Sequence, residues 1–407
     1  MSTAKRRVAI VGVGTTAKPG NHHPTKTWKD LAADAAYEAL ADAHMGPREL
    51  DAAVAAYHGE GVSEAGGLGA GMADCLGIAP KPCFVITANC CGGSVALIEG
   101  YNFVASGQYD KVLVLGGDKD GDNIGYTENI NISFDTEYDY MFGFRHRDAV
   151  ELMGNVYLQK HGYNDYGPFA ALSYQTHWFA RRNPKASAYG LPMPTRESLN
   201  NGSSLYSMMG EGSAACILVP EEDAYKYTDK PIFIEGFDYV TTSHYTAHRL
   251  GEEPMGNSFP DYVADRTDTL DISVPHMITA HNAYKMAGIT AEDVDVAQVY
   301  DLVILPLFLI EALGLCERGE AGRALMRGDF FLGGKCPVNT DGGNIARGHS
   351  SGADGLNQIV ENVYQLRGEA GERQVEGAKC AVASNVGSAY SEVATIVLGN
   401  EKFTRRF

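Results

Sequence analysis

The feature that most constrains the fold is a series of short β-branched segments that alternate with helical segments, and this series occurs twice along the chain. The first series predicts strands at 8–13, 54–57, 84–87 and 111–115, and helices at 28–43, 68–76 and 94–105. Alternation of this kind is typical of α/β proteins, in which helical crossovers join parallel strands. The sequence therefore predicts a parallel sheet covered by helices.

The second series begins after the junction Thr228-Asp229-Lys230-Pro231. It predicts strands at 232–235, 296–299, 380–383 and 393–398, and helices at 276–287 and 352–366 with one more that ends at Leu313. The similar order of elements suggests an internal duplication, although no identical repeat is visible. We therefore predict an N-terminal half at 1–230 and a C-terminal half at 231–407.

The segment from about 120 to 205 departs from this pattern. It is rich in Tyr, Asn, Asp and Met, and its hydrophobic periodicity is weak. We interpret it as an inserted loop segment that covers the site. The pattern returns at Gly210–Val219, which predicts a turn followed by a strand.

Composition narrows the function classes. The formal net charge of −18 argues against a nucleic-acid surface, although a local basic patch could still bind an anionic ligand. The eight cysteines contain no CxxC pair, so we expect no metal site within the chain and no disulfide framework. The first apolar run, Val8–Val13, is too short for a signal core or a membrane span, so we expect a cytoplasmic protein.

The stretch Thr87-Ala88-Asn89-Cys90-Cys91-Gly92-Gly93-Ser94 places two cysteines between a predicted strand and a predicted helix. At a helix N-terminus, the dipole and the free N–H groups stabilise a thiolate and can hold a developing oxyanion. The small residues that follow leave room for a thioester. Two buried core cysteines would give the same pattern, and the local chemistry does not choose between Cys90 and Cys91.

A second candidate is His349, which stands in a glycine-dense stretch just before a predicted helix. A neutral imidazole there can deprotonate a thiol, although a lone histidine is more often structural. A third pattern, Ser384-Asn385-Val386-Gly387-Ser388, directly follows a predicted strand. Its N–H groups could complete an oxyanion hole, but a plain strand-ending turn is the simpler explanation.

Together these patterns resemble the thiolase superfamily over nearly the whole chain. The family's N-x-C-x-x-G pattern falls on Cys90 and Gly93, and its G-H-P-x-G-A-x-G pattern falls on 348–355, with Ser350 in place of proline. The stretches at 300–302 and 311–322 resemble the branch related to sterol carrier protein X. The resemblance implies a thiolase fold, in which duplicated βαβαβ halves form a five-layer α-β-α-β-α sandwich.

The resemblance also implies roles for particular residues. Cys90 is expected to be the nucleophile and His349 its activating base, with the N–H groups of Cys90 and Gly387 as an oxyanion hole. Within the branch, the stretches at 57–61, 66–69, 87–90 and 339–348 resemble the thiolase-like subunit of monoacetylphloroglucinol acetyltransferase. The branch also resembles thiolase subunits such as that of benzoylsuccinyl-CoA thiolase. The histidines that line the site in the first of these fall on His58 and His146.

The chain departs from the family pattern at two catalytic positions. Tyr300 stands where many thiolases have the Asn or His that helps to hold an oxyanion. Ser384 stands where a second cysteine or a histidine acts as acid and base, and a serine has the wrong pKa for that work at neutral pH. We expect His58 or His146 to substitute. The CoA-binding residues are not identified, although Arg145 and Arg147 are candidates.

Three functions stay open at this point. The first is cleavage or formation of a 3-oxoacyl-CoA through an acyl-Cys90 intermediate, with aromatic or branched substrates such as benzoylsuccinyl-CoA among the candidates. The second is C-acetylation of acylphloroglucinols, and the third is a non-catalytic scaffold. The resemblance implies coenzyme A or acyl-CoA as substrate and no permanently bound cofactor. It also implies a homodimer or larger assembly and a small zinc-ribbon and OB-fold partner subunit, with any zinc in that partner.

Overall fold

The computed structural model describes residues 6–59, 66–122, 131, 133–246, 273–302 and 304–403, without the side chain of Arg147. Within these residues the strands are β1 (Val8–Thr15), β2 (Ala52–Tyr57), β3 (Cys83–Thr87), β4 (Val112–Asp118), β5 (Gly212–Pro220), β6 (Ile232–Thr241), β7 (Val296–Val299), β8 (Cys380–Gly387) and β9 (Glu392–Gly399). The helices that matter below are α1 (Trp28–Asp42), α3 (Leu68–Cys75), α4 (Gly92–Ser106), α6 (His146–Lys160), α7 (Gly167–Ala180), α8 (Arg196–Asn200), α10 (Ser273–Ala287), α11 (Leu305–Ala312), α12 (Ala321–Arg327) and α13 (Asp354–Arg367).

The strands form two copies of one pattern within a single sheet, β3-β2-β4-β5-β1-β6-β9-β8-β7. The order β2-β4-β5-β1 of the first half repeats as β7-β8-β9-β6 in the second half. In each copy the first two strands are parallel, and the others pair antiparallel. The expectation of a wholly parallel sheet is therefore wrong, because β5 and β9 return beside the strand that precedes them. The edge strand β3 has a short counterpart at Val338, which bridges β7 at Ala297.

The duplication extends to local irregularities of the strands. A register shift just before Gly12 in β1 has its counterpart just before Gly236 in β6. A Cβ at Gly12 would lie 2.2 Å from the carbonyl oxygen of Ala39 on α1, and a Cβ at Gly236 would lie 2.2 Å from that of Ala283 on α10. In both halves glycine lets a helix pack closely against a bulged strand.

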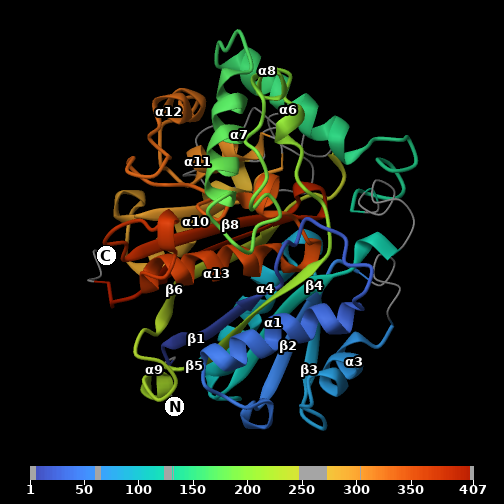
Figure 1. Cartoon of the computed structure of the whole chain (residues 1–407), viewed down its shortest axis with the longest axis vertical. Helices are drawn as coiled ribbons and strands as arrows, with labels where there is room; N and C mark the ends of the chain where they lie inside the picture. Colours follow the sequence, from blue (N-terminus) through green and yellow to red (C-terminus); the bar gives the residue numbers. More distant parts are fainter. Residues whose placement is uncertain are drawn as a thin grey trace.

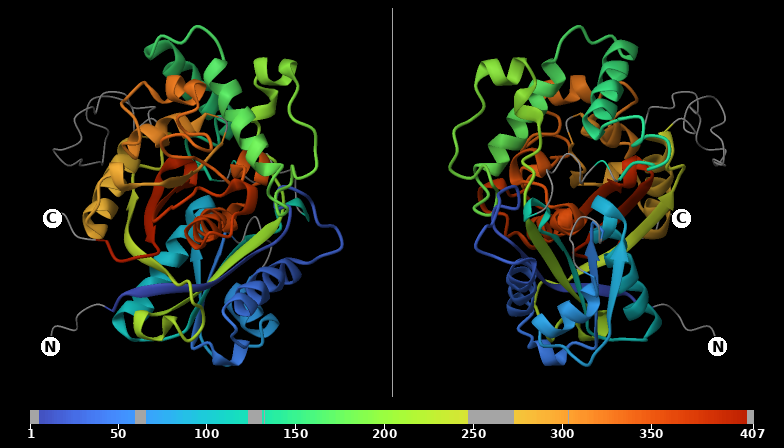
Figure 2. Two further views of the ribbon diagram at one scale, coloured as in Figure 1. Left: turned by 60° about the vertical axis from the view of Figure 1, so that its left-hand side comes forward. Right: turned by 90° about the vertical axis from the view of Figure 1, so that its right-hand side faces the viewer.

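The helices complete a layered architecture. α1 packs on the outer face of β1 and β5, and α10 packs on the outer face of β6 and β9. α4 and α13 lie between the halves, and their apolar side chains share one core with strands of both copies. In the left view of Figure 2, α13 is seen nearly end-on between the two parts of the sheet. The resulting layer order is the predicted α-β-α-β-α sandwich.

Residues 119–211 join β4 to β5 and contain α6, α7 and α8, so the expectation of a loop segment is wrong in part. Val150, Met153 and Tyr157 form a buried stripe along α6, at helical spacing, and share a core with α11 and α12. The stripe is hard to see in the sequence because exposed positions of α6, such as Leu152, are also apolar. Figure 1 shows these green helices beside the second half of the chain.

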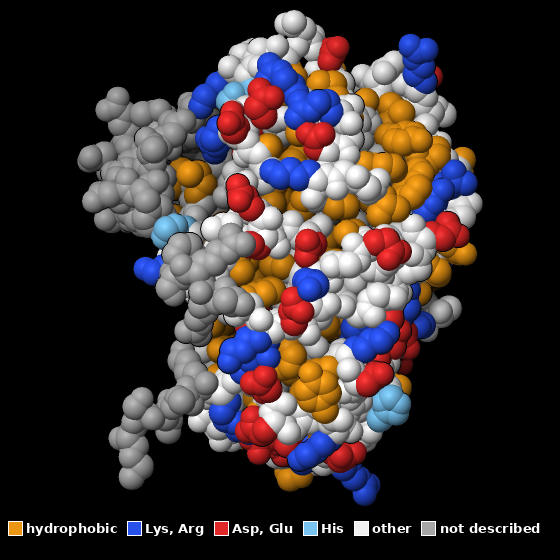
Figure 3. Space-filling model, turned by 90° about the vertical axis from the view of Figure 1, so that its left-hand side faces the viewer, with side chains coloured by type: hydrophobic (Ala, Val, Ile, Leu, Met, Phe, Trp, Pro, Cys, Tyr) orange, Lys and Arg blue, Asp and Glu red, His pale blue; other side chains and the backbone are white. Residues whose placement is uncertain are grey.

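The surface carries charges of both signs. On the face shown in Figure 3, Lys and Arg side chains are interspersed with Asp and Glu. This face therefore lacks the continuous basic patch that a nucleic-acid backbone needs. None of the described helices is long and apolar enough to cross a membrane.

Candidate active site

Cys90 lies in a single helical turn, Asn89–Cys91, that leads from β3 into α4. Its side chain is 5% exposed. Burial raises the pKa of the thiol to about 12, and a hydrogen bond from Tyr300 offsets part of this rise. The thiol is therefore neutral at rest. The adjacent N-terminus of α4 favours the thiolate once it forms, because free N–H groups and the helix dipole point there.

His349 occupies the equivalent position in the second half, just before the 3-10 turn Ser351–Ala353 that leads into α13. Burial and the positive charge of Arg347 lower the pKa of this fully buried imidazole to about 3. His349 is therefore neutral and able to accept a proton. Its Nε2 lies 3.2 Å from the hydroxyl of Tyr300, which also hydrogen-bonds Cys90. Tyr300 thus bridges the thiol and the imidazole.

Small residues allow the two central helices to meet at this point. A Cβ at Gly93 would lie 2.9 Å from the backbone nitrogen of Leu356, and a Cβ at Gly355 would lie 2.2 Å from Oγ of Ser94. Larger side chains at either glycine would separate α4 from α13. The glycines of both sequence patterns therefore bring the cysteine turn and the histidine turn together.

Gly387 brings the end of β8 against the cysteine turn. A Cβ at Gly387 would lie 2.5 Å from the carbonyl oxygen of Ala88 and 2.8 Å from the backbone nitrogen of Cys91. Its backbone is thus in contact with the turn that carries Cys90. This is the location that an oxyanion-hole N–H would need, and the role itself stays a prediction.

Arg347 and three carboxylates fix the loop that carries His349. The guanidinium forms ion pairs of 2.6 Å with Asp341 and with Asp354, and all three side chains are buried. Asp301, the neighbour of Tyr300, accepts a hydrogen bond of 2.6 Å from the N–H of Asn344 in the same loop. Buried pairs of this kind are costly to break, so they hold His349 and Tyr300 in fixed relation.

His58 and His146, the two histidines predicted to substitute for a second acid/base, reach the same region. His58 directly follows β2, and its Nε2 lies 2.9 Å from Oγ of Ser133. Burial lowers its pKa to about 4, and a proton on nearby His349 would oppose a second positive charge on His58. His146 begins α6, and burial, His349 and His58 lower its pKa to about 3. Because the three imidazoles influence one another, they form one cluster, which we call the histidine cluster.

Sequence reasoning missed Tyr390, whose hydroxyl lies 2.9 Å from Nε2 of His146. Tyr390 closes a tight turn between β8 and β9 in which Ser388, Ala389 and Tyr390 have φ of 46°, 54° and 71°. Three successive non-glycine residues in the left-handed region cost roughly 1–3 kcal/mol each and mark functional sites. No local pattern marked Tyr390, because the connection predicted between the strands ran from 384 to 392 and already contained Asn385 and Gly387.

The prediction that Ser384 directly follows a strand is wrong, because Ser384 lies inside β8. β8 continues to Gly387 and pairs with β9 along its whole length, because Ser384 and Asn385 satisfy their side chains by hydrogen bonds. Oγ of Ser384 lies 2.7 Å from Nδ1 of His276 on α10 and 3.3 Å from the hydroxyl of Thr395. Burial lowers the pKa of His276 to about 3. Ser384 is thus tied to His276 and not to the histidine cluster.

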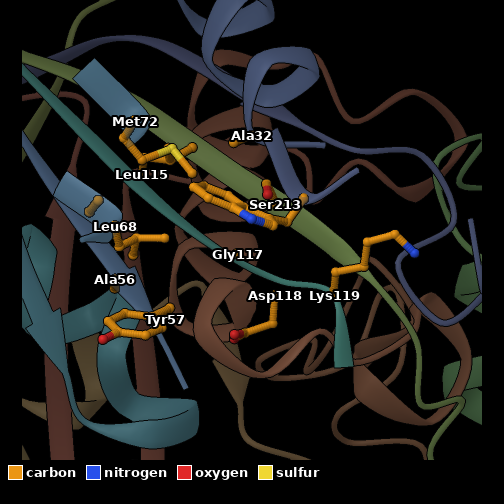
Figure 4. Close-up of a pocket in the computed structure, with 12 residues that line it drawn as sticks. Ala32, Ala56, Tyr57, Leu68, Met72, Leu115, Gly117, Asp118, Lys119 and Ser213 are labelled. Carbon is orange, nitrogen blue, oxygen red and sulfur yellow. The ribbon is translucent and has the colours of Figure 1, made fainter. Parts of the chain in front are cut away.

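The remaining candidate features are two arginines and a pocket that adjoins His58 through Asp118. Arg145 is exposed and pairs with Asp148 at 2.8 Å, and the side chain of Arg147 lies outside the described part of the chain. An apolar pocket between α1, α3 and the sheet is lined by Trp28, Met72, Asp118 and their neighbours (Figure 4). Cys90, His349 and Tyr300 are not among its lining residues. Among the described residues, no three His, Cys, Asp or Glu side chains are grouped to hold a metal ion.

The central side chains come from equivalent places in the two halves. They are His58 and Tyr300, which follow β2 and β7; Cys90 and His349, which precede α4 and α13; and His146 and Tyr390, from the β4–β5 and β8–β9 connections. All of these places lie at the carboxyl ends of parallel strands, where α/β sheets bind their ligands. Fold and site thus define a duplicated α/β protein with a cysteine, a tyrosine and histidines between its halves.

Comparison with known proteins identifies the family. A family model described as "Thiolase C-terminal domain-like" matches residues 261–400. The acetyl-CoA acetyltransferase of Methanothermobacter thermautotrophicus is 32% identical over 393 residues, which cover 94% of this chain and 96% of the relative. Human sterol carrier protein 2 is 32% identical over 413 residues, which cover 96% of this chain and 72% of the relative. The chain belongs to the thiolase superfamily.

Solved structures support the same fold. An Ltp2-ChsH2(DUF35) aldolase superimposes with a TM-score of 0.79 at 20% identity, covering 99% of this chain and 100% of the other. Human mitochondrial 3-ketoacyl-CoA thiolase in complex with CoA superimposes with a TM-score of 0.69 at 18% identity, covering 97% and 98%. At these identities the likeness is one of fold.

Proposed function

We propose that this protein is a thiolase-type acyl-CoA C-acyltransferase that cleaves or forms a 3-oxoacyl-CoA through an acyl-Cys90 intermediate. The observation that carries the proposal is the bridge made by Tyr300 between the Cys90 thiol and Nε2 of His349. A thiol with a neutral base in reach is the arrangement that nucleophilic catalysis requires. The acetyl-CoA acetyltransferase and the CoA-bound 3-ketoacyl-CoA thiolase among its relatives and structural neighbours support CoA thioesters as substrates.

In the first half of the reaction, His349 takes the proton of Cys90 across the Tyr300 hydroxyl. The thiolate attacks the C3 carbonyl of the 3-oxoacyl-CoA, and the N–H groups of Cys90 and Gly387 hold the resulting oxyanion. The C2–C3 bond then breaks, its electron pair stays on C2, and the acyl group stays on sulfur. In the second half, CoA attacks the acyl-enzyme, and Cys90 recovers its proton from His349.

The resting charges suit this sequence of steps. The raised pKa of Cys90 and the lowered pKa of His349 keep both groups neutral before substrate arrives. The ion pair of thiolate and imidazolium is therefore unfavourable at rest, and attack on the carbonyl relieves it by moving the negative charge from sulfur to the oxyanion. This arrangement protects the thiol from oxidation and alkylation between turnovers, because the thiolate is the reactive species.

A second candidate function is C-acetylation of an acylphloroglucinol, as in the acetyltransferase subunits that the sequence resembles. The observation that favours it is the histidine cluster, in which Nδ1 of His58 and Nδ1 of His349 are buried without a hydrogen-bond partner among the described residues. A phenol with several hydroxyl groups could engage such nitrogens. A non-catalytic scaffold is less well supported, because Cys90, Tyr300 and His349 are all retained in contact.

We also propose a homodimer and a partner subunit. β3 is an edge strand of the described sheet, and Phe84 and Val85 on it are 37% and 39% exposed. Exposed apolar edges favour pairing with another chain, here the β3 of a second copy. The resemblance implies a small zinc-ribbon and OB-fold partner subunit. The structurally similar Ltp2-ChsH2(DUF35) aldolase is compatible with this, because its name includes a second protein.

The test is the intact mass of the protein after incubation with a panel of acyl-CoAs and acetylphloroglucinol. We expect a mass gain of one acyl group that Cys90→Ala lacks and Cys91→Ala retains, because Tyr300 hydrogen-bonds Cys90 while Cys91 is fully buried beside Asn385. The donor that acylates fastest identifies the substrate class. No gain from any donor, also after copurification with a partner subunit, would exclude the acyl-enzyme and favour the scaffold.

A further inference from the structure

Thiolase-type cleavage needs a second proton donor, which the groups described so far do not supply. When the C2–C3 bond breaks, the electron pair left on C2 must receive a proton. His349 then holds the proton of Cys90, which has to return to the sulfur. The hydroxyl of Ser384 is engaged by His276 and Thr395, while its carbonyl oxygen accepts from the backbone N–H of Tyr300. The donor must therefore be another group that borders the same space.

Tyr390 is in contact with one of the histidines that the resemblance assigns to the site. Its side chain is 4% exposed and belongs to the same apolar core as Cys90 and Tyr300. Its hydroxyl lies 2.9 Å from Nε2 of His146, and the two rings lie 5.2 Å apart between centroids. The imidazole of His146 also packs against Phe134, at 5.8 Å between ring centroids. The phenol is thus held in one position by a half-buried histidine.

The backbone of Tyr390 is held as firmly as its hydroxyl. The left-handed turn Ser388–Tyr390 would relax if it were free, but Oγ of Ser388 accepts a hydrogen bond from the amide of Asn89 and donates one to Glu392. Asn89 is the residue before Cys90, and its own φ of 47° is left-handed. The turn that carries the phenol is therefore tied directly to the turn that carries the thiol.

We propose that Tyr390 is the second acid and base of this site and that His146 positions its hydroxyl; this rests on the proposed thiolase-type function. In cleavage, the O–H of Tyr390 gives its proton to C2 of the departing acyl-CoA, which leaves a phenolate. CoA then loses its thiol proton to this phenolate as its sulfur attacks the acyl-enzyme. In synthesis, the phenolate removes a proton from C2 of the second acyl-CoA. The number of protons balances in both directions.

His58 is the rival for this role. Its Nε2 is engaged by Ser133, whose hydroxyl lies 3.3 Å from Oδ1 of Asn89, so that side of the ring is used in a structural chain. The backbone N–H of His58 donates a hydrogen bond of 3.1 Å to the carboxylate of Asp118. This bond fixes the end of β2. These contacts favour a positioning role for His58, and the experiment includes it as a separate arm.

The test separates the two half-reactions in the full-length chain with acetyl-CoA as probe. Acylation is followed by intact mass, and proton removal is followed by exchange of the C2 hydrogens of acetyl-CoA in D2O. Tyr390→Phe should lower both the exchange and the thiolysis of acetoacetyl-CoA by about 10²–10⁴-fold, as expected for loss of an acid/base group. It should lower acylation much less, because CoA is acidic enough to leave as a thiolate without a proton donor. His146→Ala should lower the same two rates, and His146→Gln should restore part of them because its amide oxygen can accept the phenol hydrogen bond.

The matched control is Tyr284→Phe, which removes another buried tyrosine hydroxyl, bonded at 3.0 Å to the carbonyl oxygen of Leu313. It should leave all three rates unchanged. An equal loss of acylation and exchange in Tyr390→Phe would assign the residue a structural role and overturn the proposal. Retained exchange in Tyr390→Phe together with lost exchange in His58→Ala would overturn it in favour of His58. A wild-type chain that no acyl-CoA acylates would overturn the proposed function and this inference together.

Discussion

The two halves of the molecule make the same connection in opposite ways. In the first half, residues 119–211 join β4 to β5 and contain three helices that share a core with α11 and α12 of the second half. In the second half, residues 388–391 join β8 to β9 through a strained left-handed turn. The two connections meet where the hydroxyl of Tyr390 lies 2.9 Å from Nε2 of His146. The two connections thus differ greatly in length, but each supplies a side chain to the same part of the site.

The comparison teaches how a duplicated fold builds an asymmetric site. The duplication places side chains at equivalent strand and helix ends, and the residues at those ends differ in chemistry: a thiol faces an imidazole, and an imidazole faces a phenol. Acid and base are thus supplied from different halves. The predictions below ask how far the equivalence extends, beginning with the largest expected effect.

The first prediction compares His349 with His276, two fully buried histidines of the second half. His349→Ala should lower the rate of Cys90 acylation by about 10²–10⁴-fold, because the thiol loses its base. His276→Ala should keep acylation and lower the free energy of unfolding by about 1–3 kcal/mol, because Ser384 loses its buried partner. Acylation by intact mass and urea unfolding measure the two effects. Loss of acylation in His276→Ala would place Ser384 and His276 within the catalytic site.

The second prediction tests the equivalence of the two strand bulges. Gly12→Ala and Gly236→Ala should each lower the free energy of unfolding by about 1–3 kcal/mol, because the added methyl group overlaps a helix carbonyl in both halves. Gly66→Ala, where a Cβ meets nothing within 4 Å, is the matched control. Urea unfolding of the three variants gives the comparison. A loss in one half and none in the other would show that the repeat is not energetically equivalent.

The fold could be predicted from the sequence to a large extent, because buried strands and core helices leave periodic signals. The segments predicted at 296–299 and 8–13 lie within the observed β7 and β1. The insert was harder to predict, since α6 has apolar residues on both faces and buries them against a part of the chain that is distant in sequence. The pairing of β1 with β6, which joins the copies, depends on the same kind of distant contact.

The site could be predicted where chemistry coincides with a local pattern. Cys90 and His349 each precede a helix in a glycine-rich stretch, so their positions were visible. Tyr390 was not visible, because its role depends on a turn conformation and on a contact with His146 from the other half. Ser384 was assigned to a turn because the run of polar residues does not resemble a strand, and its satisfied hydrogen bonds inside the sheet are a property of the tertiary structure.

The third prediction separates the two tyrosines of the site. Tyr300→Phe should lower the rate of acylation by about 10–100-fold, the value of one hydrogen bond to a group that becomes charged. The same variant, once acylated, should exchange the C2 hydrogens of acetyl-CoA at the wild-type rate, the reverse of the pattern expected for Tyr390→Phe. Measuring acylation and hydrogen exchange in both variants tests whether their defects are opposite. Equal defects of both tyrosines in both assays would mean that they act as one unit.

The last prediction concerns stability in acid, where the two halves should contribute alike. His58 has a pKa lowered to about 4 and His276 one lowered to about 3, from the ordinary value of 6.5. Between these values and pH 6.5 the unfolded chain binds protons that the folded chain excludes, so the stability contributed is complete above pH 6.5 and is lost as the pH falls. Each histidine should add about 1 kcal/mol per pH unit to the slope of unfolding free energy against pH. His276→Gln and His58→Gln should each remove one such increment, measured by urea unfolding between pH 4.5 and 6 in steps of about half a unit. If His58→Gln leaves the slope unchanged while His276→Gln lowers it, His58 carries its proton in the folded chain, and the histidine cluster would then hold a positive charge beside the thiol before substrate binds.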